Sequence, residues 1–439
     1  MKEYKSSRYN LFVDFENGSF QRVVANTFSG TIMFADEELA TFLQKFDVTV
    51  FRNLKKQDPS LFTYLLENGF VVEAPLDELE RVRIRFEQAK YADRHMHLTI
   101  VPTERCNLAC IYCYEHLGKG SSITAAGRKR LMKFVESRKG MLSSLGVTWY
   151  GGEPLLEMKA IEDLSRFFIA MADADKIDYS ANMITNGTLL NDATIEMLMT
   201  LKVNHLQITI DGPEEQHNSR RIYRSGKRES FADVLGGLKR CAGKIPVGIR
   251  INVDKTNIHR YKELIDLLCT EKIIGPLSGN TISLGLVKDW TDCVSIDKHK
   301  MLSLDDFQHC INDFRSYLAG HGVSQEKGID FTPKIPCGAV SIANFLITPK
   351  CGLKKCWIHA TGPDDMVGDL NTGLDLTQAA AVKWTAYNPC LIDTCAACSL
   401  LPVCAGGCPY EMLTKPERRE EHCRFMSRYV EDSLVAAAT

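Results

Sequence analysis

The chain has 439 residues, of which 45% are hydrophobic and 25% charged, and its 53 basic residues nearly balance 55 acidic ones. This length allows two to four domains, and the even charge balance argues against a disordered tail or a polyanion-binding surface, so nucleic acid is not an expected partner. No secretory signal or bilayer-spanning apolar run is found, which predicts a cytoplasmic protein without a membrane partner. Sixteen cysteines in a reducing compartment indicate metal binding or catalysis rather than disulfides.

Residues 1–93 contain no cysteine and predict a small α+β module. Asn17-Gly18 is a strong hairpin signal between two apolar strands, and Asp36 is a suitable helix cap. The expected strands are 11–15, 20–24, 30–34 and 69–72, and the expected helices are 36–46, 60–68 and a charged linker helix over 76–91.

Residues 94–325 predict an alternation of strands and helices. Six such units imply a parallel sheet, and sheets of this kind carry their chemistry in the loops beyond the carboxyl ends of the strands. The expected strands are 97–101, 146–150, 178–184, 205–210, 247–253 and 281–287, with helices over 125–138, 161–172, 192–201 and 258–268.

The first of these loops contains Cys106, Cys110 and Cys113, with the spacing Cys-x3-Cys-x2-Cys. Three thiolates on one loop can hold three irons of a [4Fe-4S] cluster and leave the fourth iron without a protein ligand. A zinc knuckle is the alternative, although structural zinc prefers four closed ligands and only His116 lies nearby as a fourth.

This triplet, with an aromatic residue before its last cysteine, resembles the motif of the radical S-adenosylmethionine (SAM) superfamily. The resemblance implies that SAM chelates the open iron and is cleaved reductively to a 5′-deoxyadenosyl radical. Further segments resemble family motifs in chain order: Gly-Gly-Glu-Pro, Thr-Asn-Gly, Asp-Gly-Pro with His217, and Arg250 with Asn252. Taken singly, these segments are also common turns. The resemblance assigns cofactor contacts to Tyr112, Gly151, Gly152, Glu153, Thr185, Asn186, Thr209, Asp211, Arg221, Arg250 and Asn252.

Nine cysteines crowd the stretch 337–423, and seven of them resemble the pattern of the SPASM extension of radical SAM peptide maturases. The resemblance implies two auxiliary [4Fe-4S] clusters, three clusters in all. One would use Cys337, Cys356 and Cys408, and the other Cys395, Cys398, Cys404 and Cys423. Cys351 stands where the family has glycine; Cys351 or Cys390 could complete the first cluster, or its last iron could stay open. A double zinc ribbon is the alternative. Scattered Cys241, Cys269, Cys293 and Cys310 are expected to be structural.

Modification of a ribosomally made precursor peptide and maturation of sulfatases are the leading chemistries in this group. The amino-terminal module resembles the peptide-recognition domain related to the pyrroloquinoline quinone chaperone, which implies a leader peptide bound by residues 1–93. Sulfatase maturases carry Asp, the proposed base, after the cysteine that matches Cys356, whereas this chain has Trp357. The resemblance therefore favours a cross-link (carbon-carbon, thioether or ether) in a precursor peptide, with flavodoxin or ferredoxin as reductant.

Candidate proton acceptors are Asp211, His217 and Glu115. A non-catalytic iron-sulfur or zinc protein is the alternative from another class. The fold class expected from the resemblance is α/β, with a partial (β/α)6 radical SAM barrel over 94–325. It is preceded by a winged-helix-like α+β recognition domain with its linker helix over 1–93, and followed by a cysteine-rich SPASM domain over 326–439.

Overall fold

The computed structural model describes residues 2–17, 20–115, 120–226, 229–291, 294, 296–323, 337–360 and 365–438. The chain divides into two compact units, which are described separately. The first comprises Met1–Tyr91, Lys327–Cys337 and Ala386–Thr439, and the second Ala92–Glu326 and Gly338–Thr385. In the described part of the chain, no helix combines the length and the hydropathy needed to cross a membrane.

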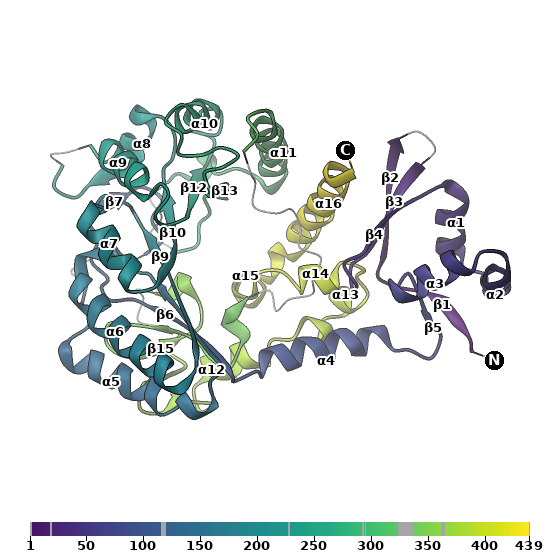
Figure 1. Cartoon of the computed structure of the whole chain (residues 1–439), viewed down its shortest axis with the longest axis horizontal. Helices are drawn as coiled ribbons and strands as arrows, with labels where there is room; N and C mark the ends of the chain where they lie inside the picture. The colour runs from purple at the N-terminus through teal and green to yellow at the C-terminus, as the bar shows by residue number, and fades with distance from the viewer. Residues whose placement is uncertain are drawn as a thin grey trace. The chain divides into compact units, whose positions relative to one another are not determined.

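The second unit is built on a ten-stranded sheet in the order β13-β12-β10-β9-β8-β6-β14-β15-β16-β17 (Figure 1). All six strands predicted from the sequence are present, and each pairs in parallel with its neighbour. Sequential parallel order is what successive βα crossovers produce. These six strands are β6 His95–Ile100, β8 Ser144–Trp149, β9 Asp178–Thr185, β10 Val203–Thr209, β12 Val247–Val253 and β13 Thr281–Leu286.

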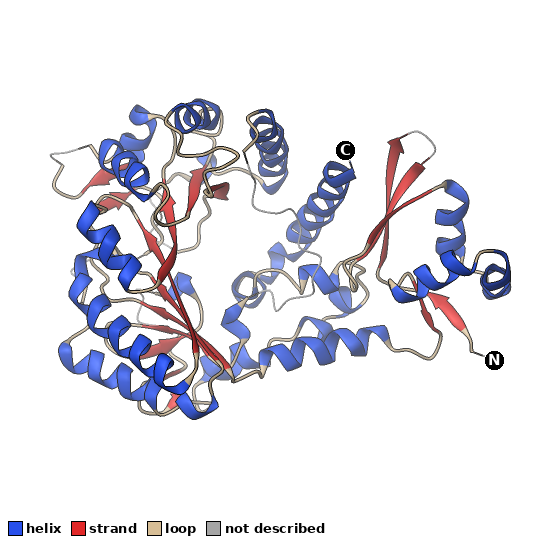
Figure 2. Cartoon of the chain, in the orientation of Figure 1, coloured by secondary structure: helices blue, strands red, loops and turns tan. Residues whose placement is uncertain are grey.

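Helices lie between these strands in the chain and cover one side of the sheet (Figure 2). Their apolar stripes pack on strands whose own side chains are largely buried, which is the pattern of a covered parallel sheet. These helices are α5 Ala125–Glu136, α6 Met158–Asp175, α7 Asp192–Thr200, α8 Glu214–Arg220, α9 Phe231–Cys241 and α10 Tyr261–Thr270. Two further helices, α11 Leu304–Gly320 and α12 Ala379–Ala386, follow β13 in the chain.

Two features of the strand pairing in this unit have no counterpart among the expected strands. The strand β14 (Asn344–Ile347) pairs in parallel with β6, so residues from the cysteine-rich stretch extend the main sheet. Beyond it β15 (Gly352–Lys354), β16 (Gly368–Asp369) and β17 (Gly373–Leu374) add antiparallel strands. The short strand β7 (Leu108–Cys110) pairs antiparallel with β11 (Arg221–Tyr223) and so ties the triplet loop to a distant segment.

The first unit contains an antiparallel sheet of β2 (Asn10–Asn17), β3 (Phe20–Asn26) and β4 (Ile32–Ala35), as the sequence predicts. Gly18 and Ser19, between β2 and β3, lie outside the described residues. The helix α2 was not expected; the Asp47 carboxylate caps it by accepting from the backbone N–H groups of Thr49 and Val50. The other elements are β1 Tyr4–Ser6, β5 Val71–Glu73, α1 Glu37–Lys45, α2 Val48–Gln57, α3 Pro59–Glu67 and α4 Glu78–Lys90.

Both faces of this sheet are packed. Val24 and Met33 join a core with residues of α1, α2 and α3, while Val23 and Ala25 pack against Leu434 and other residues near the carboxyl terminus. The first and last segments of the chain therefore share one hydrophobic core. The carboxyl-terminal helices of this unit are α13 Asp393–Ala396, α14 Leu401–Cys404, α15 Pro409–Thr414 and α16 Arg419–Ala438.

Candidate active site

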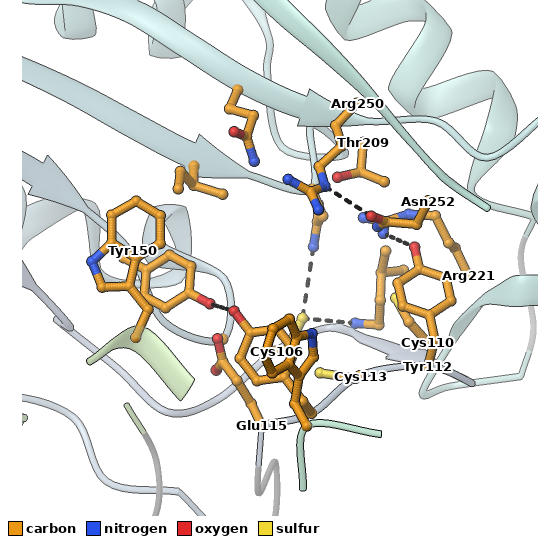
Figure 3. A pocket seen from close by; sticks show the side chains of 18 of the residues that line it. Cys106, Cys110, Tyr112, Cys113, Glu115, Tyr150, Thr209, Arg221, Arg250 and Asn252 are labelled. Carbon is orange, nitrogen blue, oxygen red and sulfur yellow. Dashed lines mark hydrogen bonds between the residues drawn. The ribbon is translucent and has the colours of Figure 1, made fainter. Parts of the chain in front are cut away.

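The three cysteines of the predicted iron loop line one cavity of about 360 Å³ in the second unit (Figure 3). The loop follows β6, and its strand β7 places Cys110 opposite Arg221 of β11. The N–H of Ile111 donates to the carbonyl of Arg220 at 3.0 Å, and that of Arg224 donates to the carbonyl of Asn107 at 2.9 Å. Backbone pairing at both ends therefore holds the cysteine loop in place.

Burial sets the acid–base state of these thiols. Removal from water disfavours a thiolate, which raises the pKa of Cys106 to about 12 and also raises the pKa values of Cys110 and Cys113. Without a metal the thiols would stay protonated, whereas coordination to iron deprotonates them. Among the described residues no three His, Cys, Asp or Glu side chains close around a single metal ion. A cubane places each thiolate on a separate iron, so this donor set fits a cluster.

Gly151 and Gly152, which follow β8, line the cavity, and the N–H of Gly152 donates to the carbonyl of Thr103 at 3.2 Å, shortly before the three cysteines. Gly151 has a φ of +110°, which favours glycine. A Cβ on Gly152 would collide with the backbone carbonyl of Arg105, the residue before Cys106. The second glycine is therefore required for close backbone packing, in addition to any approach to a ligand.

Glu153 is fully buried and is absent from the cavity lining. Its carboxylate accepts from the hydroxyl of Thr185 (2.8 Å), the N–H of Asn186 (2.7 Å) and the N–H of Leu155 (3.0 Å). Burial raises the pKa of Glu153, although these donors oppose the shift. In the structure Glu153 holds the end of β9 against the loop after β8, while its contact with the methionine ammonium stays a prediction.

Asp211 is also fully buried beneath the lining. The Tyr112 hydroxyl donates to its Oδ2 at 2.5 Å, and the N–H of Asn252 donates to its Oδ1 at 3.0 Å. Arg221 in turn donates to the Tyr112 hydroxyl at 2.6 Å. Asp211 thus joins the cysteine loop to β12, and the side chains that reach the cavity are those of Tyr112, Arg221 and Asn252.

Polar side chains from several strand ends complete this part of the cavity. Thr185, Asn186, Thr209, Arg250 and Asn252 all line it, while their contacts with the cofactor stay a prediction. Arg250 donates through Nε to the side-chain oxygen of Asn252 at 2.8 Å. Figure 3 shows Arg250, Thr209 and Asn252 on one side of the cavity and the cysteines on another.

Two of the three candidate proton acceptors, Asp211 and His217, are not part of the cavity lining. His217 is fully buried: its Nδ1 accepts from the N–H of Asp211 at 3.3 Å, and its Nε2 lies 3.1 Å from the Ser230 hydroxyl. Glu115 does line the cavity, and among the described residues its Oε2 has no hydrogen-bond partner. Desolvation raises the pKa of Glu115 to about 7.

Sequence reasoning missed several residues of the cavity lining. The sequence marks Trp357 only as the residue in place of Asp, and Tyr150 only as the end of an expected strand. The residues after β13 could have been found from the general rule that loops beyond parallel strands line the site. The further lining residues are Leu108, Tyr114, Ile184, Gln207, Leu286, Val287, Lys288, Trp290 and Ile358.

The model of the radical SAM superfamily matches residues 100–268, the segment that carries these strand ends. An uncharacterised protein of Archaeoglobus fulgidus is 30% identical over 375 residues, which are 81% of this chain and 83% of that protein. The chain belongs to the radical SAM superfamily. Membership of this family of enzymes implies a [4Fe-4S] cluster and SAM as cofactors.

Other relatives match shorter segments. The sporulation killing factor maturation protein SkfB of Bacillus subtilis is 23% identical over 207 residues, 47% of each chain. The serine-type anaerobic sulfatase-maturating enzyme of Bacteroides thetaiotaomicron is 32% identical over 146 residues, 30% of this chain and 33% of that enzyme. The chain spans about half the length of several curated relatives that it matches.

Two solved structures share the radical SAM α/β fold with its parallel-sheet core. A histidine-tagged anSMEcpe with bound AdoMet has a TM-score of 0.62 at 17% identity, covering 78% of this chain and 95% of that one. Streptococcus suis SuiB bound to the precursor peptide SuiA has a TM-score of 0.53 at 17% identity, covering 94% of this chain and 97% of that one.

Within the radical SAM site, we expect Gly152→Ala to displace the cysteine loop, because the new methyl group would collide with backbone. The free energy of unfolding should fall by about 1–3 kcal/mol, and SAM cleavage should fall by about a hundredfold through misplaced ligands. Gly140→Ala is the matched control, since no atom of the described residues lies within 4 Å of the position of its Cβ. Thermal unfolding and quantification of 5′-deoxyadenosine check the result; equal behaviour of the two variants would contradict it.

Four of the carboxyl-terminal cysteines are gathered in the first unit. The thiols of Cys395, Cys398, Cys404 and Cys423 are close enough to interact electrostatically. Burial, assisted by the other three thiols, raises the pKa of Cys404 to about 12. These are the residues that the SPASM resemblance assigns to one auxiliary cluster.

The remaining cysteines are divided between the units. Cys408 interacts electrostatically with Cys337 in the first unit, whereas Cys351 and Cys356 belong to the second. The sulfur of Cys351 lies 3.0 Å from where a Cβ on Gly127 of α5 would stand, so it faces that helix. Cys241 and Cys310 are buried and Cys269 is half-buried, while Cys293 and His116 lie outside the described residues.

Proposed function

We propose that this chain is a radical SAM maturase that installs a carbon-carbon, thioether or ether cross-link in a ribosomally made precursor peptide. One observation carries the proposal: Cys106, Cys110 and Cys113 open into the same cavity as polar groups from the ends of successive parallel strands. When bound, the cluster and SAM supply a 5′-deoxyadenosyl radical that can remove a hydrogen atom from an unactivated carbon.

The residues of the chain would hold the cluster and orient SAM. The three cysteines would ligate the cluster, and Asn186, whose Nδ2 lies 3.8 Å from the Cys106 sulfur, would support that ligand. The polar groups of Thr185, Thr209, Arg250 and Asn252, together with Arg221, would bind the charged and hydroxyl groups of SAM. Tyr112 and Asp211 would keep the cysteine loop and β12 in register.

We also propose two auxiliary [4Fe-4S] clusters, three clusters in all. Formation of a cross-link between two positions of a peptide removes two hydrogens from the peptide. One leaves as an atom to the adenosyl radical, and the other leaves as a proton and an electron, for which an auxiliary cluster is an acceptor. The gathered thiols of Cys395, Cys398, Cys404 and Cys423 support one of these clusters. A flavodoxin or ferredoxin reductant and a cytoplasmic location belong to the same proposal.

The proposed partner is a precursor peptide whose leader binds residues 1–93. SuiB was solved with its precursor peptide SuiA, and SkfB is a maturation protein. In this chain β4 forms one edge of the three-stranded sheet, and its alternate residues Ile32 (38% exposed) and Phe34 (43% exposed) point outward. An edge strand with exposed apolar side chains can accept a peptide as a further strand.

Replacing both Ile32 and Phe34 by Asp should weaken leader binding by roughly tenfold, because two apolar contacts beside the docking edge become charged. Peptides encoded by short reading frames beside the gene, fluorescently labelled, would be measured by anisotropy. Val50→Asp on α2, at a residue 53% exposed, is the control and should bind normally. Normal leader binding by the double variant would contradict the assignment of β4 as the docking edge.

Sulfatase maturation is the second candidate, favoured by the 32% identity with a segment of the Bacteroides enzyme. Against it, the position expected for a carboxylate base holds Trp357, which lines the cavity with an indole. Co-expression with the neighbouring short reading frames, or with a sulfatase, separates the two. Mass spectrometry should find a loss of two hydrogens in the peptide, and formylglycine in the sulfatase would favour the alternative.

The decisive experiment for the enzyme class is anaerobic reconstitution, reduction with dithionite and addition of SAM. Formation of 5′-deoxyadenosine is the expected result. A non-catalytic iron-sulfur or zinc protein would bind metal without cleaving SAM, so the absence of this product from fully loaded protein would overturn the proposal.

A further inference from the structure

One side of the cavity is formed by an aromatic pair, Tyr150 and Trp357, here called the aromatic platform. Their ring centroids are 5.1 Å apart with planes inclined by 27°, so the rings stack. Tyr150 is buried, with its hydroxyl bonded to that of Tyr114, whereas Trp357 is 40% exposed although it lines the cavity. A large indole surface therefore faces the interior of the site.

The platform is held rigidly. The indole Nε1–H donates to the hydroxyl of Thr99 on β6 at 2.9 Å, and the N–H of Ala360 donates to the carbonyl of Trp357 at 2.9 Å. Tyr150 and Ala360 are packed in one small core with Val101 and Leu346. An aromatic surface fixed in this way loses little conformational entropy when a ligand covers it.

Two further apolar residues of the lining adjoin the platform: Ile184, which packs against the core that holds Tyr150, and Ile358, which follows Trp357 in the chain. Figure 3 shows Tyr150 on the opposite side of the cavity from Tyr112, Arg221 and Asn252. The site thus has a polar side suited to a charged cofactor and an apolar side suited to something else.

The three cationic side chains of the lining each contact a neutral side chain of the protein. Arg221 donates to Tyr112, Arg250 donates to Asn252, and the ammonium of Lys288 lies 5.1 Å from the centre of the Trp290 ring. The Glu115 carboxyl also lines the cavity. Against the aromatic faces of the platform an acidic ligand side chain would lose its hydration, which costs more free energy than for a neutral side chain.

We propose that the aromatic platform is the subsite for the side chain of the peptide residue that is modified, and that it accepts a neutral apolar or aromatic side chain in preference to an acidic one. This inference rests on the proposed function and adds the class of substrate residue. Trp357, at the position expected for a base in sulfatase maturases, is then a specificity-determining residue.

Binding of capped amino acids to the anaerobically reconstituted full chain, saturated with SAM, tests the subsite. The probes are N-acetyl-tyrosinamide, N-acetyl-leucinamide and N-acetyl-aspartic acid amide, measured by equilibrium dialysis. Trp357→Ala should weaken binding of the two neutral probes by about tenfold, and Trp357→Phe should restore it to within about twofold of the unchanged chain. Tyr91→Ala, at an aromatic residue 54% exposed outside the cavity, is the control.

The affinity for SAM, measured in the same dialysis format, should be equal in all variants. A loss of SAM affinity in Trp357→Ala would assign the platform to the cofactor and overturn the proposal. The proposal would also be overturned if the acidic probe bound most tightly, or if Trp357→Ala left the binding of the neutral probes unchanged. Failure of the proposed function has a different signature: no 5′-deoxyadenosine forms, although neutral probes still bind in a Trp357-dependent manner.

Discussion

Replacing Cys106, Cys110 and Cys113 together by alanine is expected to abolish formation of 5′-deoxyadenosine from SAM. The physical reason is that these thiolates would be the only protein ligands of a cluster whose fourth iron must stay open for the cofactor. The variant should also lose about four of roughly twelve irons. Iron analysis and chromatography of the reduced reaction mixture measure both effects.

Cys269→Ala is the matched control for the triple variant. Cys269 is a half-buried thiol on α10 that lies outside the cavity lining, so its removal should leave both iron content and SAM cleavage unchanged. Persistence of 5′-deoxyadenosine in the triple variant would show that the cluster that cleaves SAM is elsewhere in the chain.

The second large effect is expected from Cys423→Ala. Cys423 lies on α16 and interacts with the thiols of Cys395 on α13, Cys404 on α14 and Cys398 between these two helices. Ligands drawn from separate segments let a cluster connect them, and metal binding of this kind contributes to folding. We expect the loss of about four irons and a lower unfolding temperature of the first unit, together with loss of peptide cross-linking. Cleavage of SAM without peptide should continue, since its site lies in the second unit.

Cys390→Ala provides the comparison. Cys390 is buried in a core with Tyr9, Val82 and Leu401, so its replacement should preserve the iron content while costing some stability. Iron analysis, electron paramagnetic resonance of the reduced protein and calorimetry distinguish the two variants. A larger loss of iron in Cys390→Ala than in Cys423→Ala would mean that the wrong cysteine was assigned.

The structure also affects how leader binding by residues 1–93 can be tested. From the sequence alone, residues 1–90 could be deleted as an independent module. In the fold, Val23, Ala25 and Tyr9 share cores with Leu400, Leu434 and Leu401 from the other end of the chain. Such a deletion would expose those cores, which is why the substitutions on β4 are the cleaner test.

Much of the fold could be predicted from local pattern. The six parallel strands were correct because each is a short apolar run that alternates with a helix, and the triplet of cysteines was evident from its spacing. The helix α2 was missed because its sequence is largely polar, with Phe51 as its fully buried contact. The strand β14 was missed because its pairing with β6 joins residues nearly 250 positions apart.

The sequence by itself determined the kind of chemistry, because cysteine spacing and the order of strand-end motifs are properties of the linear chain. Only the tertiary structure decided which motif residues face the cavity. Glu153 and Asp211 proved to be buried beneath it, each holding donors of the chain, while Trp357 proved to form part of its wall. The physical reason is that a polar side chain's role depends on the partners that long-range packing brings to it, and no periodic pattern encodes those partners.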